Sequence, residues 1–205
     1  DYQFSRISTS RCFFAKMNFD ENSVCADPAV RKAIAMGIDK ESFVDTLLEG
    51  NGYVANGVFP DQTAFGGDKV TTESYDPEGA KKLLAEAGYP DGFTMSLYIG
   101  STTYREKMAQ MLQYYWSQIG VTLDIKSSAM ADWSAAVVDS WQSDVVNSYG
   151  VSWNSDPDPY GFLGKFFSSQ TLHASSNAGG YNDPEMDELL NEGFGSTDNA
   201  KRAES

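Results

Sequence analysis

The stretch from residue 93 to residue 125 constrains the fold most, because it combines strand, helix and strand patterns in direct succession. Residues 93–99 alternate large apolar side chains with smaller or polar ones, and residues 121–125 (VTLDI) alternate again. Between them, residues 102–119 have an apolar stripe with the helical period, which Gly120 ends. Such a βαβ unit places its two strands parallel. We therefore expect one α/β domain, with a mixed sheet flanked by helices.

Asp-Pro steps mark where several helices begin. Five of the seven prolines follow an aspartate. Asp27, Asp76 and Asp183 each precede a proline and an apolar pattern of helical period, so each is predicted to be an N-cap with proline at the first helical position. Asp39 is predicted to cap another helix that ends at Gly50. The predicted helices that flank the sheet span about residues 28–50 (as two helices), 76–88 and 102–119, and a short helix is predicted at residues 132–141.

The segment from Ser143 to Phe167 is the candidate functional region. It begins as a β-branched and aromatic run, typical of a buried strand, and then breaks into a turn with two Asp-Pro steps. Asp158 has the pattern of another N-cap, whereas Asp156 has no helix of its own to cap. Asp156 is therefore a candidate ligand anion, and Trp153 is a candidate apolar wall beside it. A turn-stabilising role for Asp156 remains open.

Composition excludes several classes of function. The chain is 41% hydrophobic and 13% aromatic, which is enough for a substantial core in a soluble domain. It has no apolar run of about 20 residues and no leader pattern, so we expect no direct membrane insertion and a signal peptide already removed. A formal net charge of -14 argues against nucleic acid and anionic membrane surfaces as partners.

Catalysis is not expected. One histidine and two cysteines exclude most catalytic triads and zinc sites. A hydrolase that uses Asp156 and Asp158 as paired carboxylates would be the remaining possibility. The pattern around Asp158 favours a helix cap, however, and that around Asp156 favours a ligand anion or a turn. We therefore expect a binding protein without a cofactor.

Three blocks of sequence stand out: DPAVRKAIAMGIDKESFVDTLLEG at residues 27–50, YDPEGAKKLLAEAGYPDGF at 75–93 and WNSDPDPYGFL at 153–163. They resemble a known family, the extracytoplasmic solute-binding proteins of the peptide and nickel class that serve ABC importers. They occur in the family's order and span most of the chain.

The resemblance implies a bilobal protein that closes on its ligand like a hinge. Residues 1–205 would be a single α/β lobe, the C-terminal one, without the first lobe. The implied partners are a peptide ligand, the missing N-terminal lobe and the membrane permease subunits of the importer. The implied location is extracytoplasmic, either in the periplasm or as a cell-surface lipoprotein. An exported protein would also be expected to pair Cys12 with Cys25 in a disulfide.

The resemblance also assigns the ligand site. Peptide-binding members have Trp-x-x-Asp at this strand end, where the acid pairs with the peptide's α-ammonium. Residues 153–156 match that pattern position by position. The expected ligand contacts are Tyr149, Ser152, Trp153, Asn154, Ser155 and Asp156.

Two alternatives involve other ligands. Nickel-binding members resemble the same block but place a histidine in the loop downstream, and His173 lies in about that region. His173 would then be one ligand of nickel or of a metal chelate. The resemblance to some relatives of the family also leaves open that Trp153 of this chain stacks on a sugar.

Overall fold

The computed structural model describes residues 13–57, 71–139, 143–148, 160–172, 177 and 179–204. Its strands are β1 (Phe14–Met17), β2 (Phe93–Gly100), β3 (Val121–Ser128) and β4 (Val145–Ser148). Its α-helices are α1 (Pro28–Met36), α2 (Lys40–Leu48), α3 (Pro77–Glu86), α4 (Thr103–Ser117), α5 (Met130–Ser134), α6 (Tyr160–Phe167), α7 (Pro184–Gly195) and α8 (Asn199–Glu204). Short turns of other helix types are η1 (Val24–Ala26), η3 (Ala135–Asp139) and η4 (Ser169–Thr171).

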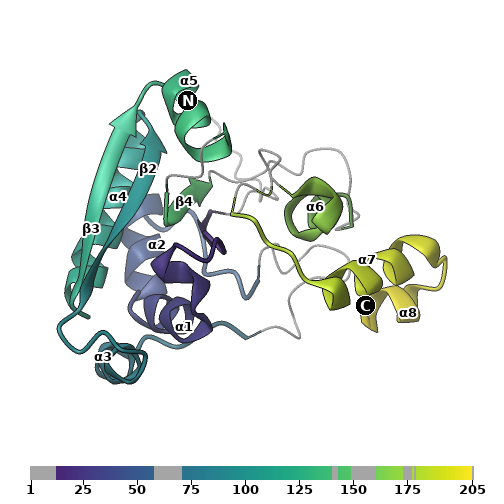
Figure 1. Cartoon of the computed structure of the whole chain (residues 1–205), viewed down its shortest axis with the longest axis horizontal. Helices are drawn as coiled ribbons and strands as arrows, with labels where there is room; N and C mark the ends of the chain where they lie inside the picture. Colours follow the sequence, from purple (N-terminus) through teal and green to yellow (C-terminus); the bar gives the residue numbers. More distant parts are fainter. Residues whose placement is uncertain are drawn as a thin grey trace, which may run out of the picture.

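The four strands form one mixed sheet in the order β1-β4-β2-β3. β2 is parallel to both β3 and β4, whereas β1 is antiparallel to β4. The predicted βαβ unit of β2, α4 and β3 is therefore confirmed, as is the mixed α/β fold. The sheet occupies one side of the molecule, while α6, α7 and α8 lie on the opposite side (Figure 1).

The main core lies between one face of the sheet and the helices α1, α3 and α4. β2 and β3 present every second side chain to it, as a half-buried strand must. The largest fully buried side chain is Trp116 of α4, whose indole Nε1 donates a hydrogen bond to the carbonyl oxygen of Ile34 at 3.0 Å. The other core residues from these elements include Val30, Ala80, Leu84, Met95, Leu97, Ile99, Leu112, Val121 and Leu123.

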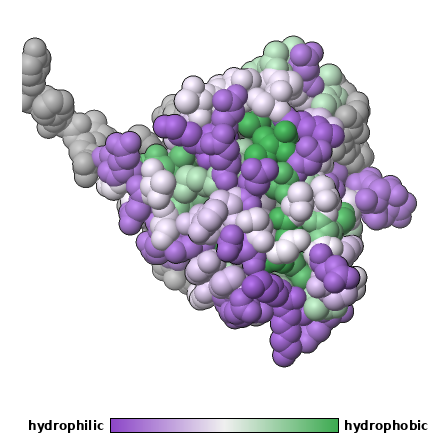
Figure 2. All heavy atoms as spheres, turned by 90° about the vertical axis from the view of Figure 1, so that its left-hand side faces the viewer, coloured by the Kyte–Doolittle hydropathy of each residue, from purple (hydrophilic) through white to green (hydrophobic). Residues whose placement is uncertain are grey.

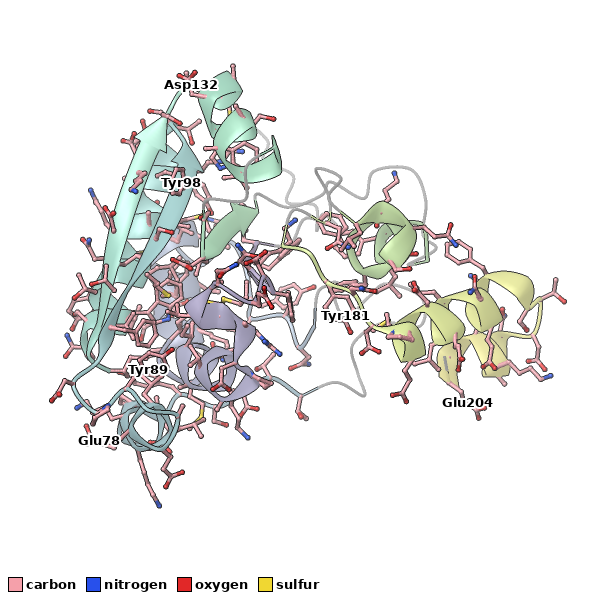
Figure 3. All side chains as sticks on the ribbon, viewed as in Figure 1. Glu78, Tyr89, Tyr98, Asp132, Tyr181 and Glu204 are labelled. Carbon is pink, nitrogen blue, oxygen red and sulfur yellow. The ribbon has the colours of Figure 1, made fainter. Side chains whose placement is uncertain are left out.

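The opposite face of the sheet has a smaller cluster. Tyr98 of β2 lies between the sheet and α5 (Figure 3), where it packs with Trp133 and Val137. On the β3 side the surface is mostly hydrophilic, with hydrophobic residues in interrupted patches (Figure 2). No helix among the described residues is long and apolar enough to cross a membrane.

The predicted caps are present. The carboxylates of Asp27, Asp39, Asp76 and Asp183 each accept a hydrogen bond from a backbone amide in the first turn of α1, α2, α3 and α7, respectively. The region predicted to hold two helices does so, but the second ends at Leu48, and the left-handed Glu49 is its C-cap. The sequence pattern predicts that Phe43, Val44, Leu47 and Leu48 of α2 are buried, but none of the residues in α2 is. α2 therefore lies at the rim of the core.

Two glycines bring the starts of β2 and β3 together. Gly92 and Gly120 directly precede the two strands, and both have positive φ, +76° and +83°. A Cβ atom added to Gly92 would clash with the carbonyl oxygen of Gly120. The close approach of these two turns therefore requires glycine, and it sets the register in which Phe93 pairs with Val121.

Candidate functional site

The carboxyl ends of β2 and β4 form the edge at which the candidate region begins. Leu97 pairs with Val145 and Tyr98 with Val146, a register that brings Ser148 level with Gly100. After β2 the chain continues through α4 to β3 on one side, whereas after β4 it continues to α6, which packs beside β1 on the other side. Such a divergence is a topological switch point, where open α/β sheets bind ligands.

A polar cluster fixes the amino end of β4. The carboxylate of Asp144 accepts hydrogen bonds from the backbone amide and the hydroxyl of Ser96, both at 2.8 Å. Its other oxygen accepts a hydrogen bond from the hydroxyl of Ser23 at 2.8 Å. The side-chain amide of Asn18 donates to the carbonyl oxygen of Ser143, and Ser143 accepts at its hydroxyl from the amide of Tyr98. β4 is therefore held in place by charge-assisted bonds to segments on both sides of it.

Aromatic contacts hold α6 against β1. The rings of Phe162 and Phe166 are stacked with centroids 4.3 Å apart, and Phe14 of β1 meets both edge-on at 6.1 and 5.8 Å. Phe14 also pairs with Ser148, the last residue of β4. α6, which follows residues 149–159, is thus fixed to β1. β1 in turn lies next to β4, the strand that precedes these residues.

The end of α6 meets the segment that leads into α7 through a second aromatic contact. Tyr181, which lies just before α7 (Figure 3), packs edge-on against Phe167 at 5.4 Å and against Phe19 at 5.1 Å. The hydroxyl of Thr171 lies within hydrogen-bonding distance of the carbonyl oxygens of Lys165 and Ser168 at the end of α6, at 3.0 and 2.8 Å. These contacts satisfy terminal groups of the helix.

Lys16 places a cation on the same aromatic cluster. Its ammonium lies 5.0 Å from the centroid of the Phe166 ring. Burial lowers the pKa of Lys16 to about 8, because the charged form loses solvation. Lys16 and Asp144 could not be recognised from the sequence, since neither belongs to a motif and their partners lie far away in the chain.

All six predicted ligand contacts lie outside the described residues, as do Asp158 and the alternative metal ligand His173. Their roles therefore stay predictions. The described elements do set the frame of the site: β4 ends directly before Tyr149, and α6 begins directly after Pro159. In the part of the chain that the structure describes, no three His, Cys, Asp or Glu side chains are grouped so that they could hold a metal ion.

The predicted disulfide also stays a prediction. Cys25 is a free, completely buried cysteine, and Cys12 lies outside the described residues. Burial raises the pKa of the Cys25 thiol to about 12, and the nearby negative charge of Asp144 adds to the shift. As a thiol, Cys25 would be unreactive in the folded protein.

Comparison with known proteins identifies the family. The family model of the bacterial extracellular solute-binding proteins, family 5 (middle region), matches residues 1–173. The chain belongs to this family. Its members are solute-binding proteins. The match agrees with the family resemblance of the sequence blocks at residues 27–50, 75–93 and 153–163.

Curated relatives of this family 5 chain bind different small molecules. It is 31% identical to heme-binding protein A of Haemophilus influenzae over 180 residues, which are 85% of this chain and 32% of that protein. It is 27% identical to the dipeptide-binding protein of Escherichia coli over 184 residues, 87% of this chain and 34% of that protein. The chain thus spans about a third of the length of these relatives.

A solved structure has the same fold over nearly the whole chain. The dipeptide-binding protein from Pseudoalteromonas sp. SM9913, in complex with Met-Leu, superimposes with a TM-score of 0.86 at 28% identity. The match covers 98% of this chain and 40% of that protein.

Proposed function

We propose that this chain is one lobe of the substrate-binding component of an ABC importer, and that the complete protein captures di- and oligopeptides outside the cytoplasm. The observation that carries the proposal is the match, over 98% of the chain, to a dipeptide-binding protein solved with Met-Leu. The first lobe and the permease subunits would be its partners. It would perform no chemistry on the peptide.

Asp156 is the proposed anchor for the peptide's α-ammonium. An ammonium that leaves water requires an ionised partner, and a bond of this kind contributes about 1.5 to 3 kcal/mol. The proposal is supported by the position of residues 149–159 in the sequence, directly after a strand that ends at the switch point. Backbone groups of the neighbouring residues would bind the peptide's amides, which permits many side chains.

Calorimetry on the complete two-lobed protein tests this assignment. Asp156→Asn keeps the shape and one acceptor but removes the charge, so the affinity for free dipeptides should fall about a hundredfold. Asp158→Asn is the matched control, since asparagine is also a good N-cap and affinity should change by less than about threefold. Unchanged affinity in Asp156→Asn would refute the anchor.

A second candidate is a receptor for a metal chelate. It is favoured by the 31% identity to heme-binding protein A, and His173 would supply one ligand to the metal. A titration with hemin and with nickel–histidine distinguishes the two candidates. Tight binding of either chelate, lost in His173→Ala, together with no peptide binding would replace the peptide proposal.

A further inference from the structure

Two aromatic rings meet across the end of β4. Phe13 directly precedes β1, and Tyr104 is the second residue of α4, which follows β2. Their ring centroids are 5.2 Å apart, with the planes tilted by 41°. Phe14 pairs with Ser148, the last residue of β4, so Phe13 lies one residue beyond the carboxyl end of β4, and Tyr104 follows the carboxyl end of β2 by four residues. The pair therefore lies at the switch point itself.

Strand alternation places this pair on a different side from the α6 aromatics. Ala15 and Met17 of β1 pack against the main core, to which α4 contributes, and Phe13 has the same parity. Phe14 has the opposite parity and contacts α6. The end of β4 is thus flanked by aromatic rings on both sides, Phe13 and Tyr104 on the side of α4, and Phe14 on the side of α6.

Phe13 and Tyr104 are less deeply buried than the core residues around them. Along the inner stripe of α4, the exposed fraction is 0% at Trp116, 5% at Leu112 and 4% at Met108, whereas Tyr104 is only half-buried. Phe13 is half-buried as well. Tyr104 belongs to the apolar stripe of residues 102–119, which predicts a core position, and the structure shows instead that it lies where the core meets the switch point.

We propose that Phe13 and Tyr104 form an apolar subsite for a side chain of the bound peptide. This inference rests on the proposed peptide-binding function. The exposed part of such rings binds apolar or aromatic groups by area burial and ring packing, and it offers little to a methyl group. The complete protein should therefore prefer dipeptides with a large apolar side chain over Ala-Ala.

The test measures selectivity in the complete protein with Ala-Ala, Phe-Ala and Ala-Phe. We expect one of the phenylalanine peptides to bind the parent at least about tenfold more tightly than Ala-Ala. In Phe13→Ala and Tyr104→Ala that ratio should fall to about one to two, while the affinity for Ala-Ala changes by less than about threefold. Tyr114→Ala is the control, since Tyr114 is on the same helix and 62% exposed.

The possible results separate the inference from the proposed function. Selectivity that survives both alanine variants, or equal losses for all three peptides, would overturn the subsite and leave peptide binding intact. A parent that binds hemin but none of the peptides would overturn both. If an alanine variant does not fold, Phe13→Leu and Tyr104→Leu replace it. These keep apolar volume but remove the ring, so preference for Phe-Ala over Leu-Ala should fall, and an unchanged preference would refute the subsite.

Discussion

Asp144 and Ser96 are joined by three hydrogen bonds across 48 residues of sequence. The amide and the hydroxyl of Ser96 both donate to the Asp144 carboxylate at 2.8 Å, and the amide of Asp144 donates to the Ser96 hydroxyl at 3.1 Å. The contact ties the start of β4 to the middle of β2. The strand that leads into the candidate site is thus positioned by a contact at its other end.

Asp144→Ala should destabilise the chain by about 3 kcal/mol, because it leaves the Ser96 amide and the Ser23 hydroxyl without their acceptor. The free energy of unfolding, measured with urea on this chain, checks the value. Asp124→Ala is the control, since the Asp124 side chain is 53% exposed and its ion pair with Lys126 is 3.6 Å long. It should change stability by less than about 1 kcal/mol. Equal losses of unfolding free energy in Asp144→Ala and Asp124→Ala would show that the hydrogen bonds of Asp144 stabilise the fold no more than an exposed ion pair does.

Gly92→Ala should be far more damaging than Gly88→Ala. Both glycines have positive φ, +76° and +97°, so alanine at either position is strained by about 1 to 2 kcal/mol. Only at Gly92 would the new Cβ also clash with the Gly120 backbone, whereas nothing lies within 4 Å at Gly88. Urea unfolding of both variants isolates the clash, which we expect to cost at least about 2 kcal/mol more. Similar stabilities would contradict the close approach of the two turns.

Because the pKa of Lys16 is lowered, we expect the free energy of unfolding to rise with pH in the alkaline range. Its pKa is lowered by burial from 10.5 to about 8. Between these values the unfolded chain binds a proton that the folded chain does not, so the free energy of unfolding increases as pH rises. The contribution is at most about 3 kcal/mol.

The difference between the parent and Lys16→Met isolates this effect from other groups that titrate above pH 8. The parent should gain stability relative to Lys16→Met between pH 8 and pH 10.5, and the difference should be constant below pH 7. A constant difference over the whole range would mean that the ammonium of Lys16 is not desolvated.

The proposed Cys12–Cys25 disulfide predicts that the exported protein, denatured without reductant, contains no titratable thiol. The count has to be made in denaturant, since the folded protein completely buries Cys25 and would conceal a free thiol. Reduction should then release two thiols and lower stability by roughly 3 kcal/mol. Two thiols before reduction would rule out the pair.

Local signals made much of the fold predictable. An aspartate before a proline or a helical pattern specifies a helix start by itself, as Asp76 does. The alternation of apolar and polar residues in β2 and β3, on either side of a helical pattern, predicts two parallel strands. α8 was not predicted, because its six residues, NAKRAE, have no apolar stripe. The half-buried state of α2 also escaped prediction, since periodicity indicates which face turns inward and not how deeply it is covered.

The site was less predictable than the fold. The candidate region follows a strand as expected, but Phe13 and Tyr104 are 91 positions apart and meet only in the folded sheet, where β4 lies between β1 and β2. No local pattern encodes that strand order. For the same reason no sequence pattern indicates that Ser23, Ser96 and Asp144 share hydrogen bonds.

The central claim, that a peptide is held by its α-ammonium, is tested most directly by comparing Met-Leu with N-acetyl-Met-Leu on the complete protein by calorimetry. The acetyl group removes the positive charge and leaves both side chains and the carboxylate unchanged. The account predicts that Met-Leu binds at least about a hundredfold more tightly, because the Asp156 carboxylate would otherwise be buried without its partner. Equal affinities for the two ligands would contradict it.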